Sequence, residues 1–316
     1  MPAPIRVVFM GTPDFAVPTL EALIEHPSFD VLAVVTQPDK PKGRGKKLAP
    51  PPVKELALAH GIPVYQPVKA REPENVELLK ALAPDYLVVV AYGQILPLSI
   101  LSIPKLAPVN LHASLLPRWR GAAPIHRAFL AGDSVTGVCA MIMAEGLDTG
   151  DTLGCKRTEI TDEDTVGRVH DRLAQSGAVL MAETLLNYKD GLITPEKQDD
   201  SKSTYAAKLT DADFVIDWSQ PAPAVSLKIR GLSPCPAAVT KLSGGLIKPL
   251  FARVPQVSGI VGAPGEVLDT SAEGITVACG EGAIVITELK PENRGPMTAH
   301  AYTLGHKVLK GERFGE

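Results

Sequence analysis

The sequence predicts an α/β protein whose first half forms an open, mostly parallel sheet and whose second half forms a small β-rich domain. Two observations predict it. Short, nearly continuous apolar runs alternate with helical patterns up to about residue 189, and the later segments are short, β-rich and separated by glycine. Continuous apolar runs are typical of strands buried on both faces, as in parallel sheets. With 316 residues, the chain is long enough for two domains, and we expect them at 1–189 and 209–316, joined by a linker at 190–208.

Apolar runs rich in valine and isoleucine mark the strands expected in the first domain. They are Ile5–Met10, Val31–Thr36, Tyr86–Ala91, Val109–His112 and Gly137–Met143. A helix is expected to start at Thr12-Pro13, with threonine as its cap and proline in its first turn. Strands alternating with helices in this way predict an open α/β sheet.

The clearest long helix is expected at Thr161–Lys189, with Thr161 and Asp164 in a variant of the capping box and Gly191 as its stop. The polar stretch Thr194–Lys208 that follows indicates a linker. The β-rich segments beyond it predict a small antiparallel barrel or sandwich. They are Ala237–Leu242, Gly265–Leu268, Gly274–Cys279 and Ala283–Leu289.

Composition and charge exclude several classes of protein. The chain is 45% hydrophobic and 21% charged, as in soluble globular proteins, and its net charge of -3 argues against a surface that binds nucleic acid everywhere. The four cysteines lack the spacing of a zinc site or a redox dithiol, so we expect buried, reduced thiols and no metal ion. The apolar stretch Tyr86–Pro104 is interrupted by glycine, proline and polar residues, which indicates a buried strand and a turn, not a membrane span. Without a visible secretion signal, we expect a cytoplasmic protein.

The segment Pro108–Pro124 contains an amide, an imidazole, a hydroxyl and two guanidinium groups. Asn110 and His112 lie two residues apart, so on a strand both side chains leave the same face. A lone histidine near apolar residues is usually a satisfied core group. Here two polar groups share one face at the end of a strand, where ligands bind in open α/β sheets. We therefore expect Asn110 and His112 to be functional.

Asp148 lies between two glycines, just beyond the apolar run that ends at Met143. Aspartate in such a turn commonly bonds only its own backbone. Since this turn also follows a strand, the carboxylate is a candidate for orienting and charging the histidine. Glu145 is a rival carboxylate that the sequence does not exclude.

Other motifs are less specific. Gly11 follows the first strand, but G-x-G-x-x-G is absent, which counts against a nicotinamide cofactor. The loop Pro41–Lys47 carries four positive charges in the six residues from Lys42 to Lys47, with glycines at 43 and 45. It is either solvated surface or a contact to a nucleic-acid backbone. The run Arg118-Trp119-Arg120 is either a stacking and phosphate-binding unit or an interdomain staple.

Taken together, Asn110–Pro117 and Gly146–Asp151 resemble the formyltransferase family that uses 10-formyltetrahydrofolate. The segments Phe9–Phe15, Thr36–Lys47, Val90–Pro97 and Arg118–Pro124 extend the resemblance over the first half of the chain. The resemblance implies a Rossmann-like formyltransferase domain followed by an OB-like β-barrel. It implies transfer of the formyl group of 10-formyltetrahydrofolate to the α-amino group of methionyl-initiator tRNA, with no metal, no membrane and no obligate protein partner.

The resemblance also assigns roles to individual residues. It implies that Asn110, His112 and Asp148 are catalytic. It implies folate binding by Ser114, Leu115, Leu116 and Pro117. It implies that the loop 43–47 contacts tRNA through Arg44, Lys46 and Lys47.

One feature departs from this pattern. From Asp211 to Glu316 ten Lys/Arg stand against eleven Asp/Glu, so a tRNA-binding surface there must be local; Arg294, Lys307, Lys310 and Arg313 are candidates. Enzyme alternatives are formyl transfer to an amino sugar nucleotide and hydrolysis of 10-formyltetrahydrofolate. A glycinamide ribonucleotide formyltransferase fits this chain less well, because such an enzyme needs no second domain. An RNA-binding OB protein without activity would have no use for Asn110, His112 and Asp148 together.

Overall fold

The computed structural model describes residues 3–42, 47–255 and 262–315. The chain divides into two compact units, each of which is described by itself. The first unit contains residues 1–124, 135–159 and 170–206, and the second contains 125–134, 160–169 and 207–316. The expected domain boundaries remain a prediction, since short pieces of the first half belong to the second unit.

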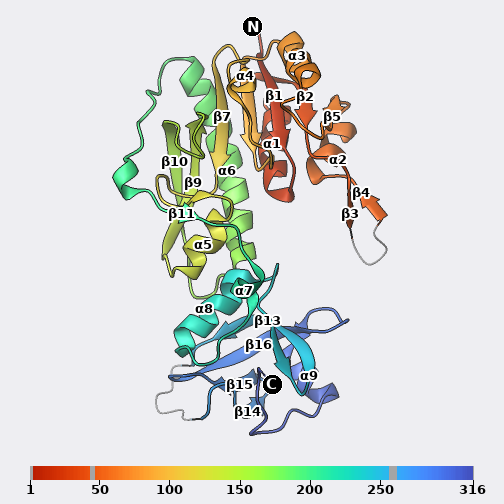
Figure 1. Ribbon diagram of the computed structural model, residues 1–316, viewed down its shortest axis with the longest axis vertical. Helices are drawn as coiled ribbons and strands as arrows, with labels where there is room; N and C mark the ends of the chain where they lie inside the picture. The colour runs from red at the N-terminus through yellow and green to blue at the C-terminus, as the bar shows by residue number, and fades with distance from the viewer. Residues whose placement is uncertain (1–2, 43–46, 256–261, 316) are drawn as a thin grey trace. The chain divides into compact units, whose positions relative to one another are not determined.

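The first unit is built on a seven-stranded sheet in the order β10-β9-β7-β6-β1-β2-β5 (Figure 1). The strands from β5 to β7 run parallel, and β9 and β10 add two antiparallel strands at one edge. This confirms the mostly parallel sheet and all five expected strands. The bounds are β1 Ile5–Gly11, β2 Phe29–Val35, β5 Val64–Tyr65, β6 Tyr86–Val90, β7 Ala107–His112, β9 Val135–Ile142 and β10 Thr152–Glu159.

Helices connect these strands. Their bounds are α1 Val17–Glu25, α2 Pro52–Ala59, α3 Pro73–Leu82, α4 Leu98–Leu101, α5 Pro124–Leu130 and α6 Val166–Lys189, with 3₁₀ turns at Asp14–Ala16 and Asp200–Lys202. The long helix α6 lies against the sheet. The Tyr86 hydroxyl of β6 donates to the Leu185 carbonyl at 2.9 Å, and the Leu111 side chain of β7 packs closely against Gly177. This packing fixes the position of β7, the strand that carries the candidate site.

Two expected helix starts are wrong. The Thr12 hydroxyl does not cap a helix but donates to the Tyr92 carbonyl at 2.9 Å, and α1 begins only at Val17. The carboxylate of Asp164 does accept the backbone N–H of Thr161 at 2.8 Å, but this turn precedes α6. In both places the polar side chain stabilises the incoming loop instead of the helix.

The stretch Thr194–Lys208 is more than a linker. Within it, β11 (Tyr205–Ala206) pairs in parallel with β8 (Arg120–Gly121), and Gln198 is buried. The polar composition of this stretch, which has no hydrophobic pattern, indicated a linker. The segment instead contributes backbone and side-chain contacts to the first unit.

The second unit is an antiparallel sheet in the order β12-β13-β16-β15-β14, with β17 paired to β16. Its core contains Trp218, whose Nε1 donates to Thr240 Oγ1 at 3.1 Å. This sheet bears out the expected OB-like domain. Its elements are β12 Thr240–Leu242, β13 Gly245–Arg253, β14 Val267–Ser271, β15 Gly274–Ala278, β16 Ala283–Pro291, β17 Met297–Thr298, α7 Asp211–Phe214, α8 Ala222–Leu232 and α9 Ala299–Gly305.

The expectation of four reduced thiols is wrong for two of them. Cys139 and Cys155 form a disulfide, because the antiparallel register of β9 and β10 places them opposite each other with Cα atoms 4.1 Å apart. Sequence spacing did not reveal this pair, since the polar strand β10 was not predicted. Cys279 is a buried free thiol and Cys235 an exposed one. Among the residues that the structure describes, no helix is both long and apolar enough to cross a membrane.

Candidate active site

The candidate site lies at the carboxyl end of β7, in the first unit. Asn110 and His112 share one face of this strand because side chains alternate along it. Asn110 is half-buried and His112 is 6% exposed. On one side, β6 pairs Val89 with Asn110; on the other, β9 pairs Cys139 with His112. The two polar groups therefore stand on a strand that neighbours hold from both sides.

Both ring nitrogens of His112 face defined acceptors. Nε2 lies 2.9 Å from the Trp119 carbonyl oxygen, and Nδ1 lies 3.5 Å from Asp148 Oδ2. A carbonyl oxygen only accepts, so Nε2 is the donor in that hydrogen bond. The carboxylate contact is longer than the 2.7–2.9 Å or so typical of charge-assisted hydrogen bonds. Nδ1 is thus the nitrogen directed at the carboxylate.

Asp148 adopts a left-handed backbone conformation, with φ of 54°. Its Oδ2 accepts the Gly121 N–H at 2.9 Å, and its side chain is 14% exposed. The rival Glu145 is exposed. The structure therefore places Asp148 beside His112, two residues that the sequence puts 36 positions apart.

The loop that follows β7 contains the residues expected to bind folate. Ser114 is fully buried and its hydroxyl donates to the Arg118 carbonyl at 2.7 Å; Leu115, Leu116 and Pro117 are half-buried. The Ser114 hydroxyl therefore stabilises the turn that carries the two leucines and the proline.

The interpretation of Arg118-Trp119-Arg120 as a phosphate-binding unit or interdomain staple is wrong for Arg120. This arginine is 9% exposed, and its guanidinium donates to Gln198 Oε1 at 3.0 and 2.8 Å and to Asp200 at 2.8 Å, all within the first unit. The Arg118 guanidinium lies 5.1 Å from the Trp119 ring centre. The backbone N–H of Trp119 donates to Thr204 Oγ1 at 2.9 Å.

Sequence reasoning missed Gln198, which contacts the turn that carries Asp148 and also the Arg120 guanidinium. Its Nε2 donates to the carbonyl oxygens of Asp148 and Gly150, at 2.9 and 2.7 Å. No composition or spacing signal marks a single glutamine in a polar stretch.

Of the residues expected to contact tRNA, Arg44 and Lys46 lie outside the described residues. Lys47 is exposed at the start of β4 (Lys47–Ala49), which pairs with β3 (Lys40–Lys42) in an antiparallel hairpin. The structure thus places the described part of this loop on a hairpin and leaves its role open as a prediction.

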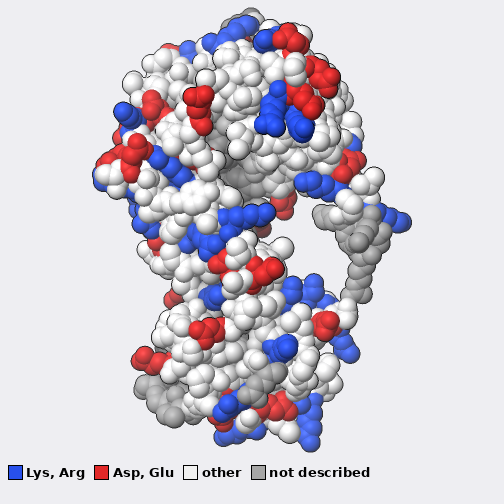
Figure 2. Space-filling model, viewed as in Figure 1, with Lys and Arg blue, Asp and Glu red and all other residues white. Residues whose placement is uncertain are grey.

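The second unit carries mixed charge. Figure 2 shows Lys and Arg interspersed with Asp and Glu over its visible face. Arg294 and Lys307 line a pocket of about 410 Å³, beside the stacked rings of Tyr302 and His306 at 4.3 Å. Lys310 is exposed.

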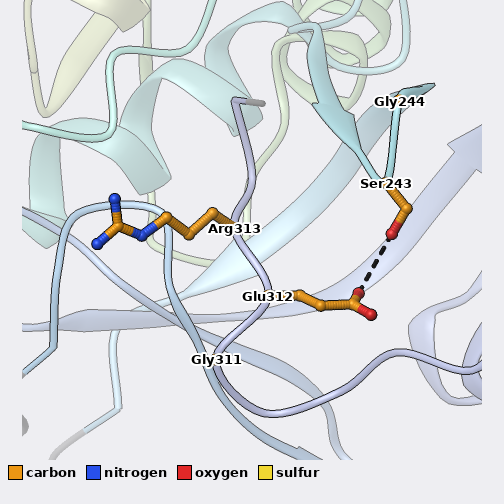
Figure 3. Close-up of a pocket in the computed structure, with 5 residues that line it drawn as sticks. All are labelled: Ser243, Gly244, Gly311, Glu312 and Arg313. Carbon is orange, nitrogen blue, oxygen red and sulfur yellow. Dashed lines mark hydrogen bonds between the residues drawn. The ribbon is translucent and has the colours of Figure 1, made fainter.

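Arg313 lines a separate pocket of about 550 Å³ in the same unit. There Ser243 Oγ donates to Glu312 Oε2 at 3.3 Å, and the Arg313 side chain extends away from that pair (Figure 3). Over the described ranges, no group of three His, Cys, Asp or Glu side chains is arranged to hold a metal ion.

This fold and site define the class of protein. The formyl transferase family model matches residues 5–185, and the model of the formyl transferase C-terminal domain matches residues 208–307. The chain belongs to the formyl transferase family and is a transferase.

Two similar proteins that match nearly the whole chain carry the same enzyme name. The methionyl-tRNA formyltransferase of Citrifermentans bemidjiense is 50% identical over 313 residues, 99% of this chain and 97% of the relative. That of Trichlorobacter lovleyi is 49% identical over 306 residues, 97% and 96% of the two chains.

Solved structures share the fold at lower identity. The N-formyltransferase of Helicobacter canadensis, in complex with folinic acid and dTDP-3-aminofucose, has a TM-score of 0.68 at 17% identity, covering 89% of this chain and 98% of the other. HypX from Aquifex aeolicus, in complex with tetrahydrofolic acid, has a TM-score of 0.66 at 17% identity, covering 98% and 50%. They support the two-part α/β and β-rich architecture.

Proposed function

We propose that this chain transfers the formyl group of 10-formyltetrahydrofolate to the α-amino group of methionyl-initiator tRNA, giving N-formylmethionyl-tRNA for translation initiation in the cytoplasm. Asn110, His112 and Asp148 carry the reaction. The observation that supports the site most directly is the approach of Asp148 Oδ2 to His112 Nδ1 at the end of β7. The near full-length relatives support the choice of acceptor.

The acceptor amine needs little activation. An α-amino group has a pKa of about 7.7–8.0, so a useful fraction is unprotonated near neutral pH. Its lone pair attacks the formyl carbon, the carbonyl oxygen gains negative charge, and the bond from carbon to the folate nitrogen then breaks. The reaction forms one amide as it cleaves another, and it requires neither a covalent enzyme intermediate nor a metal.

Two donors stabilise the oxygen that becomes charged. The side-chain N–H of Asn110 is one, and Nδ1 of His112 is the second when the ring carries a proton on both nitrogens, because the Nε2 proton is already donated to the Trp119 carbonyl. Removing one donor of this kind typically costs about 10²- to 10³-fold in rate.

Asp148 orients the imidazole and helps move a proton. Its carboxylate lies 3.5 Å from Nδ1 and fixes the orientation of the ring, and it is placed to accept a proton from the attacking amine, directly or through water. The proton that leaves the amine ends on the folate nitrogen, so charge and atoms balance.

The loop after the site fits the donor substrate. Leu115, Leu116 and Pro117 offer half-buried apolar surface next to the buried Ser114, which suits one face of a flat ring system. On the acceptor side, Arg44, Lys46 and Lys47 supply positive charge for the tRNA backbone.

The test is transfer of labelled formyl from 10-formyltetrahydrofolate, with methionyl-tRNA, uncharged tRNA, free methionine, an amino sugar nucleotide and water as separate acceptors. We expect transfer to methionyl-tRNA alone. We expect His112→Ala to lower kcat by at least about 10²-fold.

Other outcomes would contradict the proposal in distinct ways. Equal loss of formyl to water without tRNA would indicate a hydrolase, and transfer to the sugar nucleotide would indicate a different acceptor. Full activity of His112→Ala would remove the site assignment but not the reaction.

A further inference from the structure

The amide of Gln198 is buried in the first unit, although it lies in a stretch of polar composition. The side chain is 7% exposed and uses both ends. Nε2 donates to the carbonyl oxygens of Asp148 and Gly150, and Oε1 accepts both hydrogen bonds from the Arg120 guanidinium. Two donors and two acceptor positions of one amide are therefore all occupied.

These contacts close a ring around the candidate catalytic carboxylate. Arg120 is followed by Gly121, whose N–H donates to Asp148 Oδ2 at 2.9 Å. Gln198 then joins the Arg120 guanidinium to the backbone carbonyl oxygens of Asp148 and Gly150. The Gly121 N–H therefore holds the side chain of Asp148, and the Gln198 amide holds its backbone carbonyl.

The backbone of Asp148 needs such support. A φ of 54° lies in the left-handed region, which a non-glycine residue adopts only where local contacts hold it. Without the two hydrogen bonds from Gln198, the carbonyl oxygens of Asp148 and Gly150 would have to turn toward water. The carboxylate would turn with them.

We propose that Gln198 is a positioning residue for formyl transfer, which holds the turn that aims the Asp148 carboxylate at His112. The proposal rests on the catalytic role assigned to Asp148 above. Gln198 acts through Asp148 and touches no reacting atom.

A purely structural role is the competing explanation. Arg120 is a nearly buried charge, and Gln198 supplies an acceptor to it, so the amide could matter only for folding. The two ends of the amide separate these roles, because only Nε2 contacts the Asp148 turn.

Gln198→Glu is the discriminating variant. A carboxylate still accepts from Arg120, but it has no N–H for the two carbonyl oxygens, which only accept. Gln198→Met removes both ends at similar length and shows the cost of losing Arg120's acceptor. Gln175→Glu, at an exposed position on α6, is the matched control, and Asp200→Asn removes the charge of the exposed partner of Arg120 while keeping an acceptor oxygen.

The experiment measures kcat, both KM values and thermal unfolding for each variant. We expect Gln198→Glu to lower kcat about 10- to 100-fold, to change each KM less than about threefold and to lose less thermal stability than Gln198→Met, because it keeps the acceptor for Arg120. Both controls should stay within about twofold of wild type in kcat. Wild-type kcat in Gln198→Glu with a loss of stability only in Gln198→Met would overturn the proposal.

A double-mutant cycle with Asp148→Asn provides the second readout. If Gln198 acts through the carboxylate, Gln198→Glu should cost less than about threefold in kcat once that carboxylate is gone. Equal losses in both backgrounds would overturn the positioning role. Full activity of Asp148→Asn alone would instead overturn the proposed catalytic site, so the two failures are distinguishable.

Discussion

Asp148 combines a backbone conformation that few residues tolerate with a carboxylate directed at an imidazole. Asparagine and aspartate tolerate the left-handed region better than other non-glycine residues do, because their short polar side chains bond locally. At this position the same residue type therefore suits both the turn and the proposed chemistry.

Replacing Asp148 separates those two roles. Asp148→Asn keeps an oxygen for the Gly121 N–H, so we expect unfolding free energy within about 0.5 kcal/mol of wild type and kcat lowered about 10²-fold. Asp148→Ala should lose similar activity and also about 1–2 kcal/mol of stability, from strain and the lost hydrogen bond. Denaturant unfolding and steady-state kinetics check both. An Asn variant with wild-type kcat would contradict the proton-transfer and orienting role.

How much of the site the sequence predicts differs from residue to residue. The shared face of Asn110 and His112 follows from strand alternation alone. The residues alone did not decide between Asp148 and Glu145, because both lie in one turn. The structure shows that the carboxylate of Asp148 faces the imidazole. Gln198 could not be predicted, since its importance comes from long-range hydrogen bonds across 48 and 50 residues.

The turn after β9 is tightly built at Gly150. A Cβ there would collide with the carbonyl oxygen of Ile142, whereas one at Gly154 on β10 would make ordinary contact with Leu180 at 3.6 Å. We expect Gly150→Ala to cost about 1–3 kcal/mol of unfolding free energy and to lower kcat, because the turn that carries Asp148 must open. Gly154→Ala is the control, with changes below about 1 kcal/mol. Equal behaviour of the two variants in thermal unfolding and kinetics would count against this account.

Burial and the disulfide between β9 and β10 give the four cysteines different reactivity. Burial raises the pKa of the Cys279 thiol to about 12, so almost no thiolate is present near neutral pH, while Cys235 is exposed. Iodoacetamide should label Cys235 alone in the native, unreduced protein. Unfolding should add Cys279, and reduction should add Cys139 and Cys155, as peptide mass spectrometry would show. Labelling of Cys139 without reductant would contradict the disulfide.

At the scale of elements, the apolar strands were predictable and the polar ones were not. Strands β1, β2, β6, β7 and β9 carry continuous apolar runs, whereas β10 at the sheet edge contains lysine, arginine and glutamate. An edge strand loses one packed neighbour, so its sequence needs less apolar character. The disulfide escaped prediction for the same reason, because a pair across two strands appears only when both strands are known.

At the scale of the whole molecule, acid stability depends on buried or paired carboxylates. In the second unit, hydrogen bonds from Arg127 and from the backbone N–H of Thr210 lower the pKa of Asp213 to about 2. A carboxyl with a depressed pKa stabilises the folded state above its unfolded pKa of about 3.9, and this stabilisation is lost as pH falls toward 2. Asp213→Asn should therefore lose about 1–2 kcal/mol at pH 7, and its difference from wild type should disappear near pH 2.

Thermal unfolding of both proteins between pH 2 and 7 measures this difference. Lys80→Met, which removes an exposed ion pair with Glu77, is a control with an expected change below about 0.5 kcal/mol. A constant gap between Asp213→Asn and wild type across that pH range would contradict the linkage.

The contacts of residues 190–206 with the first unit also determine where the chain can be divided. A fragment that ends at Lys189 would retain Asn110, His112 and Asp148, yet it would lack the glutamine amide and the strand partner of β8. A fragment that ends at Ala206 would keep both. A fragment that keeps these contacts must therefore extend at least to Ala206, 17 residues beyond the end of α6.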